Sequence, residues 1–158
     1  MKGFTLIEMM IVVALIGILA VIAIPQFASL LNKAQEGAVK GQLGGLRSSI
    51  NIYYSDMDGQ YPADLTTGIT TALNLIPSLP LVRIPPAAGQ NNPGHLQNNA
   101  EGLAGQGQSC PPNMGDFADT QAWYYFPFYV GAANTACAGT VYIHCTHNDS
   151  RGTVWTSY

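Results

Sequence analysis

The first part of the chain is almost wholly apolar. From Phe4 to Ile24 only Thr5 and Glu8 are polar. About 20 apolar residues in a helix are enough to cross the ~30 Å hydrocarbon core of a bilayer. A cleaved secretory signal would end in small residues, but here Pro25 follows and an amphipathic pattern continues. We therefore expect a membrane-spanning helix that is retained.

Beyond Pro25 the apolar residues recur at spacings of three and four, which predicts a helix with one buried face. They form two stripes offset by one position: Phe27, Leu31, Ala34 and Ala38, then Val39, Leu43, Leu46, Ile50, Tyr53 and Met57. The polar face holds Asn32, Lys33, Gln35, Glu36, Lys40, Gln42, Arg47 and Asn51. The helix should end near Ser55, because "SDMDGQYP", which begins there, is rich in turn and stop residues.

Four glycines lie inside this expected helix: Gly37, Gly41, Gly44 and Gly45. Each weakens an isolated helix by about 1 kcal/mol relative to alanine. Two interpretations stay open at this point. The helix is loosely specified, or its small residues let another helix or a sheet approach closely.

After the helix the pattern changes to short, interrupted elements. Residues 65–84 have apolar positions for one short helix, which prolines interrupt. Residues 87–115 are rich in Gly, Asn and Gln, and they predict a long surface loop. Strands are expected at 123–130, 140–145 and 152–158, with "THNDSRG" as the hairpin turn between the last two.

Two details refine these strands. Pro127 restricts the first strand to a sheet edge or a bulge. Alternation in the second strand puts Val141, Ile143 and Cys145 on one face. The whole pattern predicts an α+β fold, in which a small antiparallel sheet lies across the second half of a long N-terminal helix.

Charge is sparse, since 9% of residues are charged and the net charge is −3. This is too little charge, and of the wrong sign, for a surface that grips nucleic acid or anionic lipid. The three cysteines, Cys110, Cys137 and Cys145, all lie far beyond the apolar segment. Export favours a disulfide between two of them, but the sequence leaves all three pairings open.

Glu8 is the exception within the apolar segment. A carboxylate inside a bilayer costs roughly 2.5–3.5 kcal/mol on insertion scales and needs a partner. Lys2 lies only at the edge of the segment. If the chain is cut after Gly3, the new α-amine of Phe4 lies four residues before Glu8 on the same helix face. That amine, from the same chain or from a neighbouring copy, would supply the missing charge.

The segment "KGFTLIEMMIVVALIGILAVIAIPQF" closely resembles the N-terminal motif of type IV pilins and of the pseudopilins of type II secretion. The resemblance implies that a prepilin peptidase cuts between Gly3 and Phe4 and methylates Phe4. It also implies that Glu8 pairs with the N-terminus of a neighbouring subunit during filament assembly. In many assembled filaments of this family, the stretch that matches Gly17 to Pro25 loses helical order, and both residues are weak helix formers.

A second motif, "DGQYP", resembles the segment after the long helix in major pseudopilins and related pilins. Together the two motifs imply the lollipop fold of this family, a protruding helix that carries a head. The implied division is a leader peptide at 1–3, a transmembrane and assembly helix at 4–27, an amphipathic helix at 28–56, and a globular head at 57–158 with the variable loop 87–115.

These motifs favour a structural subunit of a type IV pilus-like filament. The resemblance is closest to the major pseudopilin of type II secretion, which acts in protein export. The alternative is a major or minor pilin of a surface type IV pilus, serving adhesion, twitching or DNA uptake. The implied partners are further copies in a helical filament, the prepilin peptidase, minor pilins and an inner-membrane assembly platform. The chain would cross the inner membrane once, with its head in the periplasm or on an extracellular filament.

A rival from another class is a membrane-anchored periplasmic enzyme or binding domain, which needs convergent polar residues. His144, Cys145, His147 and Asp149 are close in sequence, but adjacent strand residues point to opposite faces and would not converge on a metal. We expect no catalytic residue, no cofactor and no metal.

Calcium needs a separate argument. Resemblance to major pseudopilins would imply a calcium loop near the C-terminal strands, where Asp116, Asp119 and Asp149 are the acids at hand. The Asp-Pro-Trp-Gly-like stretch usual in that loop is replaced here by "DTQAWYYFP". Calcium is therefore left out of the expected sites.

Overall fold

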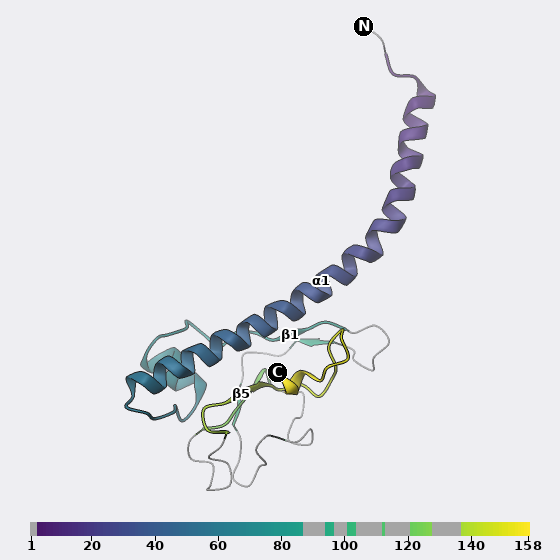
Figure 1. Ribbon diagram of the computed structural model, residues 1–158. Coiled ribbons are helices and arrows are strands. Elements are labelled where there is room, and N and C mark those ends of the chain that lie inside the picture. Colours follow the sequence, from purple (N-terminus) through teal and green to yellow (C-terminus); the bar gives the residue numbers. More distant parts are fainter. Residues whose placement is uncertain (1–2, 87–93, 97–100, 104–111, 113–120, 128–136) are drawn as a thin grey trace. The chain divides into compact units, whose positions relative to one another are not determined.

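The computed structural model describes residues 3–86, 94–96, 101–103, 112, 121–127 and 137–158 (Figure 1). The chain divides into two compact units, Met1–Ala34 and Gln35–Tyr158, and the helix α1 (Leu6–Asp56) contributes to both. The other described elements belong to the second unit: η1 (Thr66–Ala72, π-helical), β1 (Arg83–Ile84), β2 (His95–Leu96), β3 (Glu101–Leu103), β4 (Trp123–Tyr125), β5 (Val141–Ile143) and η4 (Trp155–Ser157, a 3₁₀ turn).

The limits of α1 follow from local sequence. The helix ends at Asp56, next to the expected end, and Pro25 lies inside it without ending it. Asp58 and Gly59 then adopt positive φ angles of 51° and 84°. Gly takes this left-handed conformation without strain and Asp tolerates it, so the Asp-Gly pair turns the chain as predicted.

Within the second unit, α1 buries one face against the sheet (Figure 1). Val39, Leu43, Leu46 and Ile50 are at most 3% exposed. They share one core with residues of the two strands β4 and β5. This confirms the later of the two predicted stripes, and with it the α+β fold. The earlier stripe, Phe27, Leu31, Ala34 and Ala38, is exposed instead.

The prediction that Glu36 lies on the exposed polar face of the helix is wrong, because this residue is only 7% exposed. Its carboxylate accepts hydrogen bonds from the backbone N–H of Ser150 at 2.8 Å and from the Ser150 hydroxyl at 2.6 Å. The partner comes 114 residues later in the chain. Helical periodicity reports only on neighbours within the helix, so it could not reveal this pair.

The four glycines in the second half of α1 lie against no other element in the described parts of the chain. A Cβ atom added at Gly37, Gly41, Gly44 or Gly45 would find no atom within 4 Å beyond its immediate helix. The suggestion that they let a sheet approach closely is therefore wrong for the described sheets. Approach by another helix stays a prediction.

The strands form two small sheets. β4 pairs antiparallel with β5, with Tyr124 opposite Tyr142. β3 joins the other side of β4 in parallel, with Gly102 opposite Tyr124. β1 and β2 make a separate antiparallel pair. The larger sheet is therefore mixed, because it contains one parallel and one antiparallel pair. Its strand β3 lies in the region that was expected to be a surface loop.

Large aromatic side chains form much of the core. Trp123, Tyr125 and Trp155 are fully buried. Trp123 Nε1 donates a hydrogen bond to the carbonyl of Pro80 at 2.8 Å, and the Tyr125 hydroxyl donates to the carbonyl of Pro62, also at 2.8 Å. Buried polar groups need such partners. The two bonds tie the segment after α1, including the proline of "DGQYP", to β4.

η1 takes the place of the short helix expected within residues 65–84. It packs tightly on the chain that follows α1, because a Cβ atom at Gly68 would lie 2.3 Å from Cβ of Pro62. The chain just after η1 is held to it by two hydrogen bonds. The N–H groups of Leu75 and Ile76 donate to the carbonyl of Ile69, at 2.9 and 3.4 Å.

The prediction of a strand at 152–158 is wrong. A single bridge joins Asn148 to Val154, and the chain then enters η4. The reason is local, since the Asp149 carboxylate accepts the backbone N–H of Thr153 at 2.9 Å and holds the chain in a tight turn. Short polar side chains compete with strand pairing in this way. Residues 128–130 of the first expected strand, and most of the expected loop 87–115, lie outside the described residues.

Candidate functional site

The N-terminus of α1 is closed by a reciprocal pair of side chains. The backbone N–H and the hydroxyl of Thr5 both donate to Oε2 of Glu8, at 2.8 and 2.7 Å. The N–H of Glu8 donates back to the Thr5 hydroxyl oxygen at 3.3 Å. This is a capping box, which satisfies amide groups that the first turn of a helix leaves without partners.

The capping box uses only one oxygen of the Glu8 carboxylate. Oε1 accepts no hydrogen bond from any residue in the described part of the chain. Glu8 itself is exposed, and Phe4 beside it is 81% exposed. One carboxylate oxygen is therefore engaged within the helix, and the other accepts no hydrogen bond among the described residues.

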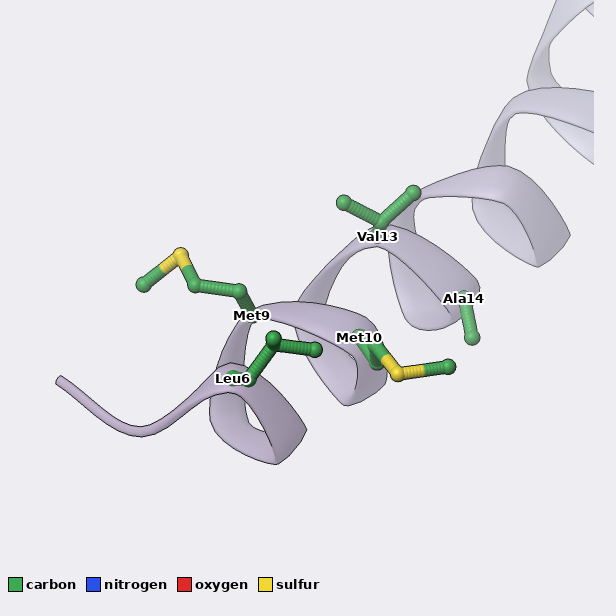
Figure 2. A pocket seen from close by; sticks show the side chains of 5 residues that line it. All are labelled: Leu6, Met9, Met10, Val13 and Ala14. Atoms are coloured by element: carbon green, nitrogen blue, oxygen red, sulfur yellow. The ribbon is translucent and has the colours of Figure 1, made fainter.

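The rest of the N-terminal unit presents apolar side chains on all sides. Each of the following is between 45% and 81% exposed: Phe4, Leu6, Ile7, Met9, Met10, Ile11, Val12, Val13, Leu15, Ile16, Ile18, Leu19, Val21, Ile22, Ile24, Phe27, Leu30 and Leu31. Figure 2 shows Leu6, Met9, Met10, Val13 and Ala14, which line a hollow on the helix surface. All of these lining residues come from one helix, α1.

Among the described residues, α1 is the one helix long and apolar enough to cross a membrane. None of its most apolar 18-residue window is buried. A helix that is apolar all round is at home in lipid or among other helices, not in water.

The structure places the other expected site residues along the same unit. Gly3 lies in the short non-helical segment before α1, and Gly17 and Pro25 lie inside the helix. Helical order from Gly17 to Pro25 is therefore intact in the single chain. Phe4 is still joined to Gly3 here, so the expected pairing of its amine with Glu8 stays a prediction.

A second polar cluster holds the C-terminal turn on α1 within the second unit. Lys40 Nζ lies 2.7 Å from Oδ2 of Asp149, whose side chain is fully buried. The Tyr158 hydroxyl donates to the same oxygen at 2.5 Å. Lys40 also lies over the Tyr158 ring, 3.8 Å from its centroid, and 5.3 Å from the centroid of Trp155. Cation–π contacts of this kind add to the ion pair.

Both charged groups of this cluster have shifted pKa values. Burial alone would raise the pKa of the Asp149 carboxyl, but the hydrogen bonds from Lys40, Tyr158 and the backbone hold it well below its usual range. Burial alone would lower the pKa of Lys40, but its hydrogen bonds to Asp149 and Tyr158 and the attraction of their charges raise it. The arrangement favours a stable ion pair rather than proton transfer.

The cysteines differ in state. Cys137 is disulfide-bonded, whereas Cys145 is a buried thiol whose Sγ lies 3.6 Å from Nδ1 of His147. Because Cys145 is a thiol, the two pairings that include Cys145 are excluded. Cys110 lies outside the described residues.

No group of three or more metal-ligating side chains comes together among the described residues. The carboxylate oxygens of Asp149 are already engaged by Lys40, Tyr158 and backbone N–H groups. Asp116 and Asp119 lie outside the described residues.

The N-terminal geometry agrees with comparisons to known proteins. Residues 1–24 match the family described as the prokaryotic N-terminal methylation motif. This segment therefore carries the N-terminal motif that its resemblance to type IV pilins implied. The chain is 45% identical over 74 residues to the fimbrial protein EcpC of Eikenella corrodens, which covers 46% of this chain and 48% of EcpC.

Two further relatives bear pilin names. The type IV major fimbrial protein FimA of Dichelobacter nodosus is 46% identical over 71 residues, covering 45% of this chain and 44% of FimA. The type IV major pilin protein PilA of Myxococcus xanthus is 46% identical over 57 residues, covering 36% of this chain and 26% of PilA. The chain thus spans about half the length, or less, of these relatives. No solved structure is significantly similar to it.

Sequence reasoning missed one residue of this site, Thr5. The signal was present, because Thr5 and Glu8 have the Ser/Thr-x-x-Glu spacing of a capping box immediately before a long apolar run.

Proposed function

We propose that this protein is a type IV pilin, the structural subunit of a type IV pilus filament. The observation that carries the proposal is the N-terminal unit, whose apolar side chains are exposed on every side of α1. Before assembly, lipid would cover this surface in a single span of the inner membrane. In the filament, the same surface of neighbouring copies would cover it, in a helical homo-oligomer.

The proposed processing is a cut between Gly3 and Phe4 by a prepilin peptidase, with N-methylation of Phe4. The match of residues 1–24 to the methylation motif supports it. The new Phe4 amine would pair with Glu8 of a neighbouring subunit, which places a charge pair in an apolar filament core. A buried pair of this kind acts as a register device, because a mismatched subunit leaves a charge without its partner.

The proposed division has a leader at 1–3, an assembly helix at 4–27, an amphipathic helix at 28–56 and a head at 57–158. Assembly would use an inner-membrane platform and minor pilins, as in the family. The head would face the periplasm first and the outer surface of the filament afterwards.

The comparisons favour a surface pilus over a secretion pseudopilus. The relatives named above are fimbrial and pilin proteins. The pseudopilin interpretation rests on the resemblance of the long helix and the "DGQYP" motif to those of major pseudopilins. None of these three relatives is named as an enzyme, in agreement with the expectation that the chain has no catalytic role.

Electron microscopy of cells, with a strain lacking this chain as control, tests the proposal. We expect long surface filaments in the parent strain that disappear in the deletion and return with the complementing chain. Retained surface filaments combined with lost protein export would support the pseudopilin instead. Mass spectrometry of the filament protein should find methylated Phe4 at the N-terminus, and an intact Met1 would contradict the processing.

A further inference from the structure

The capping box at the start of α1 uses the two oxygens of the Glu8 carboxylate differently. Both Thr5 donors go to Oε2, at 2.8 and 2.7 Å. Oε1 accepts no hydrogen bond within the described residues. The two oxygens of one carboxylate are therefore in different states before any neighbour arrives.

From this asymmetry we infer that Thr5 is a positioning residue for assembly. It holds Oε2 of Glu8 so that Oε1 is presented to the Phe4 amine of a neighbouring subunit. The inference rests on the proposed function, since it concerns how the filament contact forms. It assigns to Thr5 a role in assembly beyond that of closing the helix.

The physical reason is the loss of freedom on binding. A glutamate side chain has several rotatable bonds, and fixing them when the neighbour docks opposes association. Thr5 fixes them beforehand within the single subunit. The N–H and hydroxyl donors of Thr5 also stabilise the carboxylate before assembly, when the helix lies in lipid. Burying a hydrogen-bond acceptor in lipid without a partner is unfavourable.

The arrangement survives the proposed cleavage. All three hydrogen bonds join atoms of Thr5 and Glu8, which stay on the retained side of the Gly3–Phe4 bond. Cleavage adds an amine directly before Thr5. The subunit would then carry a positioned acceptor and a new donor at one end of α1.

The test compares Thr5→Val, which keeps the shape but loses the hydroxyl, with Thr5→Ser, which keeps the hydroxyl. Thr67→Val is the matched control, because Thr67 is exposed on η1 and its hydroxyl makes no hydrogen bond among the described residues. Full-length variants are expressed in the deletion strain. The measurements are the amount in the membrane fraction, the N-terminal mass, and the yield of sheared filaments.

We expect Thr5→Val to be inserted and cleaved like the parent chain, with filament yield about tenfold lower, the size expected for a lost hydrogen bond to a charged group. Thr5→Ser should restore the yield to within about twofold. The ¹³C resonance of the Glu8 carboxyl in micelles should move in Thr5→Val and stay in place in Thr67→Val. A merely structural cap would move the same carboxyl signal but would leave the filament yield at the parent level.

Parent-like filament yield from Thr5→Val would overturn the inference and leave the proposed function standing. Failure of that variant to insert or to be cleaved would also overturn it, since Thr5 would then act before assembly. Absence of filaments from the parent chain and from Thr67→Val would instead overturn the proposed function.

Discussion

The two halves of α1 treat apolar side chains in opposite ways. In the first half Ile22 is 61% exposed and Phe27 is 67% exposed. In the second half Leu46 is 2% exposed and Ile50 is 1% exposed. Both halves carry large apolar side chains, so the type of these residues does not explain the difference in their exposure. The second half has a sheet of its own chain to cover it, and the first half needs lipid or other copies.

The contrast extends to polar groups. Glu8 in the first half is held on one oxygen and presented on the other. Glu36 and Lys40 in the second half find their partners, Ser150 and Asp149, inside the same chain. These two charged groups of the second unit are therefore paired within the chain. The N-terminal unit instead keeps an unfinished surface, meaning exposed apolar side chains and one carboxylate oxygen that accepts no hydrogen bond among the described residues. Unfinished surface in a single subunit is what a polymerising protein needs.

The largest expected effect comes from removing the acid of the unfinished half. Glu8→Leu should leave membrane insertion intact or improved, because a leucine costs nothing in lipid. Filaments should be absent, because the Phe4 amine of the neighbour would be buried without a partner. Counts of filaments per cell, beside membrane-fraction blots, measure this. Normal filaments from Glu8→Leu would show that the charge pair is dispensable.

The next effect tests whether burial really differs between the halves. Ile50→Ala should lower the free energy of unfolding of the head by about 2–5 kcal/mol, because it opens a cavity in the core. Ile22→Ala, its matched partner in the exposed half, should change it by less than about 0.5 kcal/mol. Urea unfolding in detergent, followed by tryptophan fluorescence, measures both. Equal effects at the two positions would contradict the division of α1.

A somewhat smaller effect is expected from breaking the ion pair between Lys40 and Asp149 in the head. Asp149→Asn should destabilise the head by roughly 2–3 kcal/mol, because Lys40 loses its counter-charge. Asp56→Asn, at the exposed end of α1, is the control and should have little effect. The comparison uses the same unfolding measurement, and a neutral Asp149→Asn would mean that the cluster does not support the head.

The same cluster predicts a pH dependence with a definite sign. The pKa of Asp149 is lowered in the folded state, so its stabilisation is present above the ordinary value of about 3.9 and is lost as the pH falls further. The pKa of Lys40 is raised, so its stabilisation is present below about 10.4 and is lost as the pH rises through the folded value. Asp149→Asn should flatten the acid limb, and an unchanged acid limb would exclude Asp149 as its source.

The smallest expected effect concerns a glycine on the outer side of the second half. Gly41→Ala should raise the stability of the head by up to about 1 kcal/mol, because alanine favours a helix and the added Cβ meets nothing. If another helix packs closely there in the filament, the same variant should assemble less well. Unfolding curves and filament yield, measured together, separate the two roles. A destabilised single subunit would show that the glycine already serves a contact within the chain.

Local patterns predicted the helix well. The end of α1 and the buried stripe from Val39 to Ile50 follow from spacing and turn residues, which act over a few positions. The capping box was equally local, and Thr5 and Glu8 have its spacing, so it was within reach of the sequence.

Contacts between residues far apart in the sequence could not be predicted from such local patterns. Nothing near Glu36 indicates Ser150, and nothing near Lys40 indicates Asp149, since the fold alone brings them together. The last expected strand failed for a related reason. Asp149 binds backbone N–H groups that a strand would have used, and this competition depends on an acid whose orientation is set by Lys40.

The most direct test of the account is electron cryo-microscopy of filaments purified from the parent strain. The account predicts that this chain forms the filament, that it begins at Phe4, and that Oε1 of Glu8 lies at about 2.7–3.2 Å from the amine of a neighbouring subunit. A map in which Glu8 faces solvent, or filaments built from a different polypeptide, would contradict it.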